Sequence, residues 1–437
     1  MKQLFICCML LYSFNYVMAQ EITEADYRFS LEDCITFAFA NSYTRQSMKL
    51  SEQSSKEVYD LSKYQRYPNL SASLSEGLSH SQGAPGSSSS NWNGSYGINS
   101  SVTLYQGGTI TNTIEQNKLR ADQAVLQTQQ YDLNLVVQIL QAFLSVLGNQ
   151  ELLNYQEAVV IASAEQLIQG EARWKAGSIL ESDYLLLNAQ DAGAKSNVVN
   201  TKISIVNSLI TLKNLLSMEP LENLEIVYPS DREIDVLALL PSQEIALQRC
   251  LATSPTLRLN QNSIEIAANS LQLAKAGYYP TVSLGGSLGT SHSTDYSNFG
   301  NQLSNNFNQR INLSVSIPIF DNYRTKSQVA QNKIALAQAE ITKKEQQLSL
   351  SQMLIQEYQS VISLYTQYRA NNISQDAYYK TYIAYKAKFD AGAATVVDLL
   401  QQQNNYLNSL NGFIQSKYGF LLNRKILDVY MGEPITL

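Results

Sequence analysis

Four short segments of the chain alternate apolar and polar residues with a period of two. In residues 68–78 the apolar positions share one face and serines take the other, the apolar set being Leu70, Ala72, Leu74 and Leu78. The same alternation recurs over residues 96–105, 280–289 and 308–317. The pattern predicts β-strands with one apolar and one polar face. Each has about ten residues, the length of a tilted strand that crosses a bilayer with apolar side chains outward.

The alternation predicts which face of each strand meets lipid and which face lines a lumen. Leu284 and Val315 should face lipid, whereas Ser283 and Ser314 should face a lumen. The segments between paired strands, residues 79–95 and 290–307, are long and rich in Gly, Ser and Asn. We therefore expect long loops at that end of the strands, on the external side of the membrane.

The remaining segments follow a helical period. One leucine series has seven-residue spacing, comprising Leu119, Leu126, Leu133, Leu140 and Leu147. Sustained sevenfold spacing indicates coiled-coil-like packing. The pattern predicts helices over residues 31–65, 109–175, 180–216, 243–277, 323–390 and 396–430. The longest of them would each extend on the order of 100 Å at 1.5 Å per residue.

The chain contains the same order of predicted strands and helices twice. Residues 173–185 read RWKAGSILESDYL and residues 388–400 read KFDAGAATVVDLL, and their shared glycines are Gly177 and Gly392. We infer two tandem strand–strand–long helix–helix repeats, 20–220 and 241–437, joined by a linker at 221–240. Each glycine predicts the tight tip of a helical hairpin. Asp183 and Asp398 then fall in the first turns of the returning helices, where the helix dipole favours a carboxylate.

The N-terminal residues 1–19 predict a secretory signal peptide, with Lys2 before an apolar core and Ala19 at a small-residue cleavage site. We expect Cys34 and Cys250 to be buried thiols rather than a disulfide. No mature segment approaches 18 consecutive apolar residues, so we expect no transmembrane helix. The net charge is −6, which gives no basic field for nucleic acid. Such a secreted chain is either soluble or a β-type membrane protein.

Aromatic residues stand where the predicted strands meet the helices, namely Tyr67, Tyr105, Tyr279 and Phe320. Rings at this position are typical of the interfacial girdle of an outer-membrane barrel. They are also consistent with hydrophobic plugs where strand turns into helix. The two interpretations do not exclude each other.

The sequence offers no constellation for catalysis, metal binding or a cofactor. We expect the two histidines, His80 and His292, to be solvated loop residues rather than metal ligands. Residues 285–289 match G-x-S-x-G, but that motif needs a strand–turn–helix elbow, and here it lies within an alternating strand. We therefore predict that the protein is not an enzyme and needs no cofactor.

Four strands are too few to close a barrel, because about eight is the smallest number whose interior side chains can fill. Lipid tolerates no open sheet edge. The chain must therefore oligomerise if the strands span a membrane. A cyclic trimer would give twelve strands and a wide lumen, although this argument supports an oligomer without fixing the number three.

The two repeats, the signal peptide and the paired A-G-x(5)-D-x-L tips together resemble the TolC-type outer-membrane efflux protein family. The resemblance covers essentially the whole mature chain. It implies an α+β membrane protein that trimerises into a 12-stranded β-barrel continued by a periplasmic α-helical barrel. It further implies a passive exit duct in the outer membrane of a Gram-negative bacterium. Its partners would be a periplasmic adaptor protein and an inner-membrane RND or ABC transporter.

The resemblance also suggests roles for the tips. Asp398 matches an acidic position that rings the periplasmic constriction, and Lys388 and Asp390 remain as neighbouring locking charges. The adaptor-docking positions would be Gly177, Gly392, Arg173 and Asp183. This sequence departs from the family pattern at Gln401, which replaces a second acid, and at Ala394, which replaces a basic residue.

Two alternatives share part of this evidence. A type I protein-secretion channel would use the same fold, and a neighbouring ABC transporter gene would favour it. A soluble periplasmic coiled-coil scaffold would explain the helices, but it has no use for four alternating strands.

Overall fold

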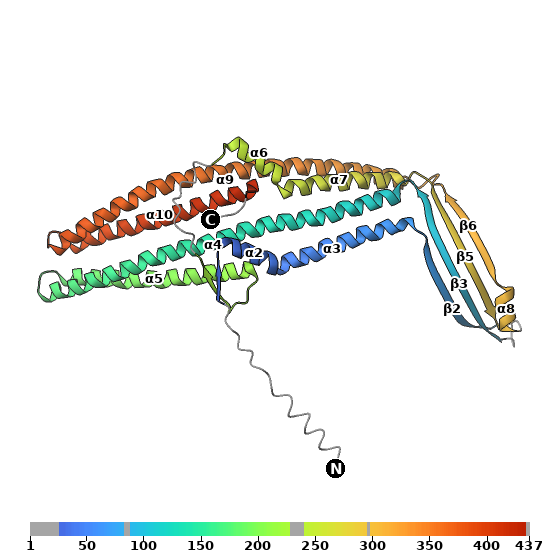
Figure 1. Cartoon of the computed structure of the whole chain (residues 1–437), viewed down its shortest axis with the longest axis horizontal. Helices are drawn as coiled ribbons and strands as arrows, with labels where there is room; N and C mark the ends of the chain where they lie inside the picture. Colours follow the sequence, from blue (N-terminus) through green and yellow to red (C-terminus); the bar gives the residue numbers. More distant parts are fainter. Residues whose placement is uncertain (1–25, 83–87, 228–239, 295–297, 434–437) are drawn as a thin grey trace, which may run out of the picture.

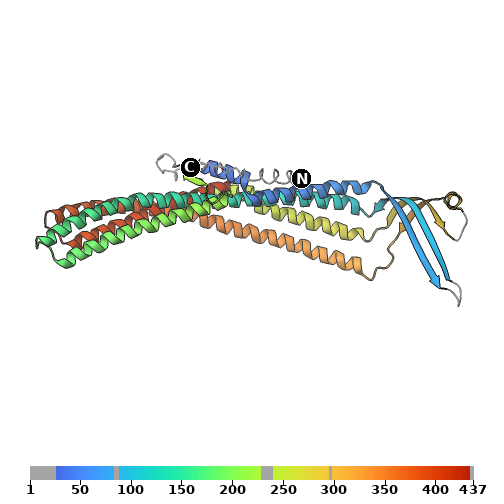
Figure 2. The same cartoon turned by 90° about the horizontal axis from the view of Figure 1, so that it is seen from below.

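The computed structural model describes residues 26–82, 88–227, 240–294 and 298–433. The predicted signal peptide lies outside the described residues, as do most of the linker and short parts of both external connections. The chain forms a long molecule with a β-sheet at one end and two helical hairpin tips at the other (Figures 1 and 2).

Two helices of equal length determine the long axis. Helix α4 (Thr109–Lys175) and helix α9 (Arg324–Asp390) each contain 67 residues. The returning helices α5 (Glu181–Leu216) and α10 (Val396–Met431) each contain 36 residues. The two hairpins lie side by side with their tips at the same end (Figure 1). The four helices thus confirm the predicted long helix–helix half of each repeat, with bounds within one residue.

Each predicted first helix is instead two helices. The first copy has α2 (Leu31–Asn41) and α3 (Tyr43–Lys63), followed by the short 3-10 helix η1 (Tyr64–Arg66). The second copy has α6 (Gln243–Thr253) and α7 (Pro255–Ala276).

A serine causes the break in both copies. The hydroxyl of Ser42 accepts the Arg45 N–H at 3.3 Å, and the hydroxyl of Ser254 accepts the Leu257 N–H at 3.4 Å. Each serine is therefore the N-cap of the second helix. In the second copy Pro255 adds to the break, because it lacks the N–H that a continuous helix needs and suits the first helical position.

The sheet contains four antiparallel strands in the order β2-β3-β5-β6. Their bounds are β2 (Asn69–Gln82), β3 (Ser88–Gln106), β5 (Thr281–Ser293) and β6 (Asn308–Ser316). The first hairpin is longer than expected, because the polar stretch assigned to a loop pairs as strand, for example Ser79 with Asn91. The prediction of a long first loop is therefore wrong: hydroxyl and amide side chains do not prevent the backbone ladder from extending. In the second connection β5 likewise extends, and helix α8 (Phe299–Asn305) follows.

The strand register confirms the two predicted faces. Across the sheet Ala72 pairs with Ile98, and Ile98 pairs with Leu288. Directly opposed residues in an antiparallel pair share a face, so the apolar positions of neighbouring strands form one surface. Leu284 and Leu313 extend this surface to β6. A bulge between β3 and β5 at Leu104 shifts the register near the helical end.

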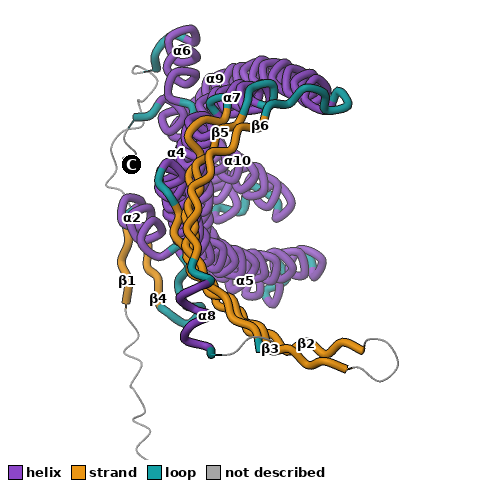
Figure 3. Tube along the Cα trace, turned by 90° about the vertical axis from the view of Figure 1, so that its right-hand side faces the viewer, coloured by secondary structure: helices purple, strands orange, loops and turns teal. Residues whose placement is uncertain are grey.

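Two short strands were not predicted. Strand β1 (Asp26–Phe29) pairs in parallel with β4 (Asn223–Ile226), which belongs to the linker. Arg28 and Glu225 form an exposed ion pair of 2.6 Å across them. The pair lies beside α2 (Figure 3). Four-residue strands carry too little alternation to be recognised from sequence.

The main core surrounds the middle of α4. Leu140, Phe143 and Leu147 are almost fully buried there, together with Leu212 and Leu216 of α5. Helix α4 also contains an 18-residue window apolar enough to cross a membrane, and half of that window is buried. We expected no such helix; packing against the neighbouring helices accounts for its apolar character.

The structure confirms the predicted buried thiols, which lie in two different clusters, and most of the predicted leucine series. Cys34 and Cys250 are free and buried, as predicted, and burial raises their pKa to about 12 and about 11. In the series with seven-residue spacing all the leucines are buried except Leu133, which is half-buried.

Corresponding turns from strand to long helix use the same backbone with different residues. Gly107 and Gly108 have φ of +56° and +84°, and Asn322 and Tyr323 at the matching positions have +54° and +61°. Only the first turn demands glycine: a Cβ on Gly107 would lie 2.7 Å from the Cβ of Tyr279. The repeat therefore preserves backbone geometry even where it does not preserve sequence.

Candidate functional site: the hairpin tips

Both hairpin tips end their long helix in the same way. Gly177 and Gly392 have left-handed φ of +73° and +77°. The Gly177 N–H donates to the Trp174 carbonyl at 2.9 Å, and the next N–H donates to the Arg173 carbonyl at 2.8 Å. Residues 388–393 repeat both hydrogen bonds. This Schellman arrangement satisfies the last carbonyls of a helix, and it confirms the predicted glycine turns.

Asp398 closes a capping box at the start of α10. The Thr395 hydroxyl donates to the Asp398 carboxylate at 2.7 Å and accepts the Asp398 N–H at 3.1 Å. The hydrogen bonds from Thr395 lower the pKa of Asp398 below its ordinary value of 3.8. The exposed carboxylate is therefore ionised at neutral pH.

The first tip lacks this box. Leu180 occupies the N-cap position of α5 and has no side-chain cap, and Asp183 is half-buried in the first turn. Both aspartates thus lie where the sequence predicted, in the first helical turn. Their surroundings differ, so the two tips are not chemically equivalent.

Arg173 joins the two tips. Its guanidinium donates to the Phe389 carbonyl at 2.8 Å and to the Asp390 carbonyl at 3.0 Å. It also lies 4.5 Å from the centroid of the buried Phe389 ring. These carbonyls end α9, where the helix dipole favours a cation. Arg173 therefore points into the interface between the hairpins.

The other predicted locking charges are free of ion pairs within the described part of the chain. Lys388 is exposed, with its ammonium 4.8 Å from the Tyr385 ring centroid. The Asp390 side chain is exposed, and only its backbone meets Arg173. The structure gathers Asp398, Lys388 and Asp390 at one tip without bonding them to one another.

Sequence reasoning missed two of these roles. The Thr395 cap was visible as T-x-x-D before an apolar run, a signature of a helix N-terminus. The contact between Arg173 and Phe389 has no local signature, because it joins residues from different repeats.

The predicted aromatic residues all lie at the end of the sheet that meets the helices. Tyr67 precedes β2, Tyr105 lies near the end of β3, Tyr279 precedes β5 and Phe320 follows β6. All four side chains are exposed in the single chain. The structure therefore places them at one level, and the interfacial girdle and the hydrophobic plugs both stay predictions.

The far end of the sheet corrects the expectation for one histidine. His80 is exposed, but it lies in β2 rather than a loop. His292 is only 8% exposed, and its Nε2 lies 3.3 Å from the Glu76 carboxylate. Trp92 and Phe299 pack around its ring. His292 is thus a packed residue of β5, because the strand continues through the segment that we expected to be a solvated loop.

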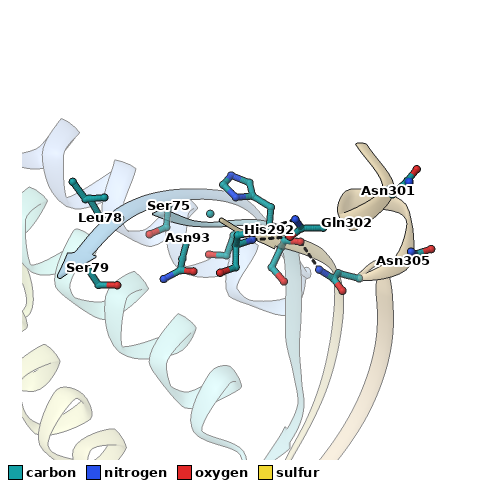
Figure 4. A pocket seen from close by; sticks show the side chains of 14 residues that line it. Ser75, Leu78, Ser79, Asn93, His292, Asn301, Gln302 and Asn305 are labelled. Carbon is teal, nitrogen blue, oxygen red and sulfur yellow. Dashed lines mark hydrogen bonds between the residues drawn. The ribbon is translucent and has the colours of Figure 1, made fainter. Parts of the chain in front are cut away.

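A shallow cavity opens beside this histidine on the other face of the sheet (Figure 4). Its side chains are hydroxyls and carboxamides, such as Ser75, Asn93, Gln302 and Asn305. Gln302 of α8 bonds both the N–H and the carbonyl of Ser293, which covers the strand edge beyond the end of β6. Among the described residues no cluster of three or more metal-ligating side chains occurs. Residues 285–289 lie within β5, where the nucleophile-elbow geometry is absent.

The structure is a strongly two-faced sheet continued by a layer of very long helices. A sequence model of the outer membrane efflux protein family matches residues 37–217 and 246–433. The chain belongs to this family. Its class is a transport channel and not an enzyme class, and its location is the outer membrane, with a large periplasmic part.

Known proteins agree with this assignment. The chain is 24% identical over 345 residues to outer membrane protein TolC of Vibrio cholerae, covering 75% of this chain and 74% of the relative. It is 22% identical over 304 residues to alkaline protease secretion protein AprF of Pseudomonas aeruginosa, covering 68% and 61%. It matches the structure of CusC with a TM-score of 0.80 at 17% identity, over 92% of both chains. The resemblance to the family and the α+β fold class inferred from sequence are thus confirmed, whereas the trimeric barrel stays a prediction.

The Arg173 contact predicts a coupling between the tips. Arg173→Ala removes two hydrogen bonds from a charged donor and a cation–π contact, which together are worth about 2 kcal/mol. Backbone amides at residues 386–394, on the other hairpin, should then exchange with deuterium about tenfold faster or more. Lys175→Ala is the matched control, because Lys175 pairs with Glu171 of its own helix, at 2.7 Å. Equal exchange in both variants would show that Arg173 does not hold the hairpins together.

Proposed function

We propose that the chain is the exit duct of a tripartite efflux pump. Three copies would form a 12-stranded barrel in the outer membrane and a helical barrel in the periplasm. The duct would receive small molecules through a periplasmic adaptor and an inner-membrane RND or ABC transporter. The observation that supports this proposal is the row of unpaired backbone groups along each edge of the sheet.

The sheet order leaves β2 and β6 with one unpaired side each. In lipid every unpaired backbone group costs several kcal/mol, so an open edge cannot persist. If β2 of one copy pairs with β6 of the next, the interface is head-to-tail, and such an interface forms a ring when the rotation from copy to copy closes. Three copies of four strands give a barrel wide enough for a lumen.

Exposed apolar stripes on two helices also indicate that a neighbouring copy packs against each side of the helical layer. In the half of the helical layer that carries the tips, α5 packs on α4 and α9 packs on α10, which leaves α5 and α9 at its two borders (Figure 3). In the half next to the sheet, α3 packs on α4 and α9 packs on α7, so the borders there are α3 and α9. Exposed apolar residues recur at every seventh position along α9, comprising Ile334, Ile341, Leu348, Ile355 and Ile362. A second exposed stripe follows α5, comprising Val199, Ile203, Val206 and Ile210. These stripes have the spacing of coiled-coil seams, so a neighbouring copy would bury both.

The aromatic level of Tyr67, Tyr105, Tyr279 and Phe320 supports a membrane boundary at the helical end of the sheet, because such rings favour the interface. The tips then project into the periplasm. A Cβ at Gly177 or Gly392 would meet no atom within 4 Å. We assign adaptor docking to these open turns and to the neighbouring Asp183, and the gate to Asp398, Lys388 and Asp390.

A second candidate is a type I protein-secretion channel. The likeness to AprF, whose name describes alkaline protease secretion, favours it. Both candidates predict the same trimer and the same tips. The genes next to the coding sequence separate them, because a lone ABC exporter favours secretion and an RND transporter favours efflux.

The sheet faces provide a test of the membrane topology. Leu284→Arg places a charge among lipid tails and should cost roughly 2–4 kcal/mol near midplane. Ser283→Arg points the same charge into the lumen and should cost much less. We expect the SDS-resistant trimer in the outer-membrane fraction to fall sharply in the first variant only. Equal yields from the two variants would contradict the assignment of lipid and lumen faces.

If the tips dock the adaptor, bulky residues there should abolish export without reducing trimer assembly. Bulky replacements at both tips, Gly177→Trp with Gly392→Trp, should abolish export of a fluorescent pump substrate while the trimer yield stays intact. Gly177→Asn with Gly392→Asn is the control, because Asn tolerates the left-handed conformation and adds little bulk. Retained export in the Trp pair would exclude the tips as the docking surface.

The gate role predicts a change in ion selectivity. Threefold symmetry would bring three Asp398 carboxylates toward one axis, where they attract cations. Asp398→Asn keeps an acceptor for the cap but removes the charge, so the reversal potential in a salt gradient should show weaker cation preference. Asp183→Asn should change it much less. In the single chain the hydrogen bonds from Thr395 hold the pKa of Asp398 below its ordinary value, so the cation preference should decline only under acidic conditions. Wild-type reversal potentials in both variants would exclude Asp398 from the constriction.

A further inference from the structure

The polar face of the sheet carries one charge among the described residues. Every second position over 69–79 of β2, 91–103 of β3 and 281–293 of β5 is Ser, Thr, Asn or Gly. In β6 the corresponding positions from 308 to 316 are Asn or Ser, with the single exception of Arg310. The register places Arg310 opposite Ser287, and Ser287 opposite Asn99. Arg310 therefore shares the face that would line the barrel.

No described residue neutralises this guanidinium. Arg310 is exposed and forms no hydrogen bond or ion pair with the described part of the chain. The carboxylate of the same sheet, Glu76, lies on the opposite face and bonds Tyr96 and His292. An arginine offers five donors in a planar fork that matches a carboxylate or phosphate. Arg310 thus retains its full capacity for an anionic ligand.

We propose that Arg310 is the anion-recognising residue of the duct's outer-membrane bore. The exported molecules would carry a carboxylate, sulfate or phosphate group on an otherwise neutral polar body. The inference rests on the proposed trimeric duct, because threefold symmetry converts one guanidinium into a ring of three around the lumen.

The surroundings of Arg310 favour this specificity. The rows of hydroxyl and carboxamide side chains do not repel an anion. They also do not compete with the anion for Arg310, as a neighbouring carboxylate would. Most of the side chains that line the cavity at the outer end of the same face are likewise uncharged hydroxyls and carboxamides (Figure 4). A single sign of charge in a confined bore focuses the field and raises the local concentration of oppositely charged ligands.

The test uses the purified full-length protein in planar bilayers, with sucrose octasulfate as the anionic probe on the external side. Wild type and Arg310→Lys should be blocked by the probe, and Arg310→Gln should resist block. In a KCl gradient Arg310→Gln should also raise the ratio of K⁺ to Cl⁻ permeability on the order of twofold. Glu76→Gln is the matched control: it removes a charge from the other face and should behave as wild type. In 1 M salt, where the Debye length is about 3 Å, the differences should shrink.

The outcomes separate this inference from the proposed function. Failure of the wild-type protein to form a conducting trimer would overturn the duct itself. A conducting wild type that the probe does not block, or an Arg310→Gln variant with unchanged block and selectivity, would overturn the role of Arg310 and leave the duct intact.

Discussion

The backbone hydrogen bonds at the two free edges of the sheet are the constraint on which the proposed assembly depends. Strands β2 and β6 each leave a row of N–H and carbonyl groups unpaired in one chain. Water could satisfy these groups, but lipid cannot. An outer-membrane location therefore requires a second copy at each edge. The head-to-tail pairing that results would also set the neighbours of α5 and α9, whose apolar stripes need cover along their whole length.

The chain contains the strand–strand–helix–helix arrangement twice, and the two copies share their backbone geometry but differ in their side chains. The turn into the long helix has the same left-handed backbone at Gly107-Gly108 and at Asn322-Tyr323. The tips share a Schellman turn, but only the second has a capping box, between Thr395 and Asp398. Backbone geometry is common to both copies because packing along the hairpin demands it. Side chains at the exposed tip are under no such demand, so the second tip can present a fixed carboxylate.

Periodicity predicted the long elements well and the short or polar ones poorly. Helices α4, α5, α9 and α10 fall within one residue of expectation, because dozens of residues repeat one pattern. The break at Ser42 was missed, since a serine N-cap inside an apolar-periodic segment resembles a solvent-facing residue. The strand around Ser79 was missed because its ladder depends on pairing across the hairpin rather than on its own hydrophobicity. Arg173 was recognised as a tip charge, but its partner lies in the other repeat, and only the fold brings them together.

The two charges assigned to the lumen would act on a permeating molecule one at a time. Asp398 lies at one end of the long hairpin and Arg310 lies in the sheet beyond the other, so about 100 Å of helix separates them. The Debye length is about 8 Å at physiological salt, so neither field reaches the other. The narrowest point, which threefold convergence would place at the acidic tip, has the larger effect on ion flow. Arg310 would act in a wider bore, where it alters affinity more than conductance. An anionic cargo would therefore need the adaptor and transporter to carry it past the acidic entrance, and only then would it meet an attractive charge on the route outward.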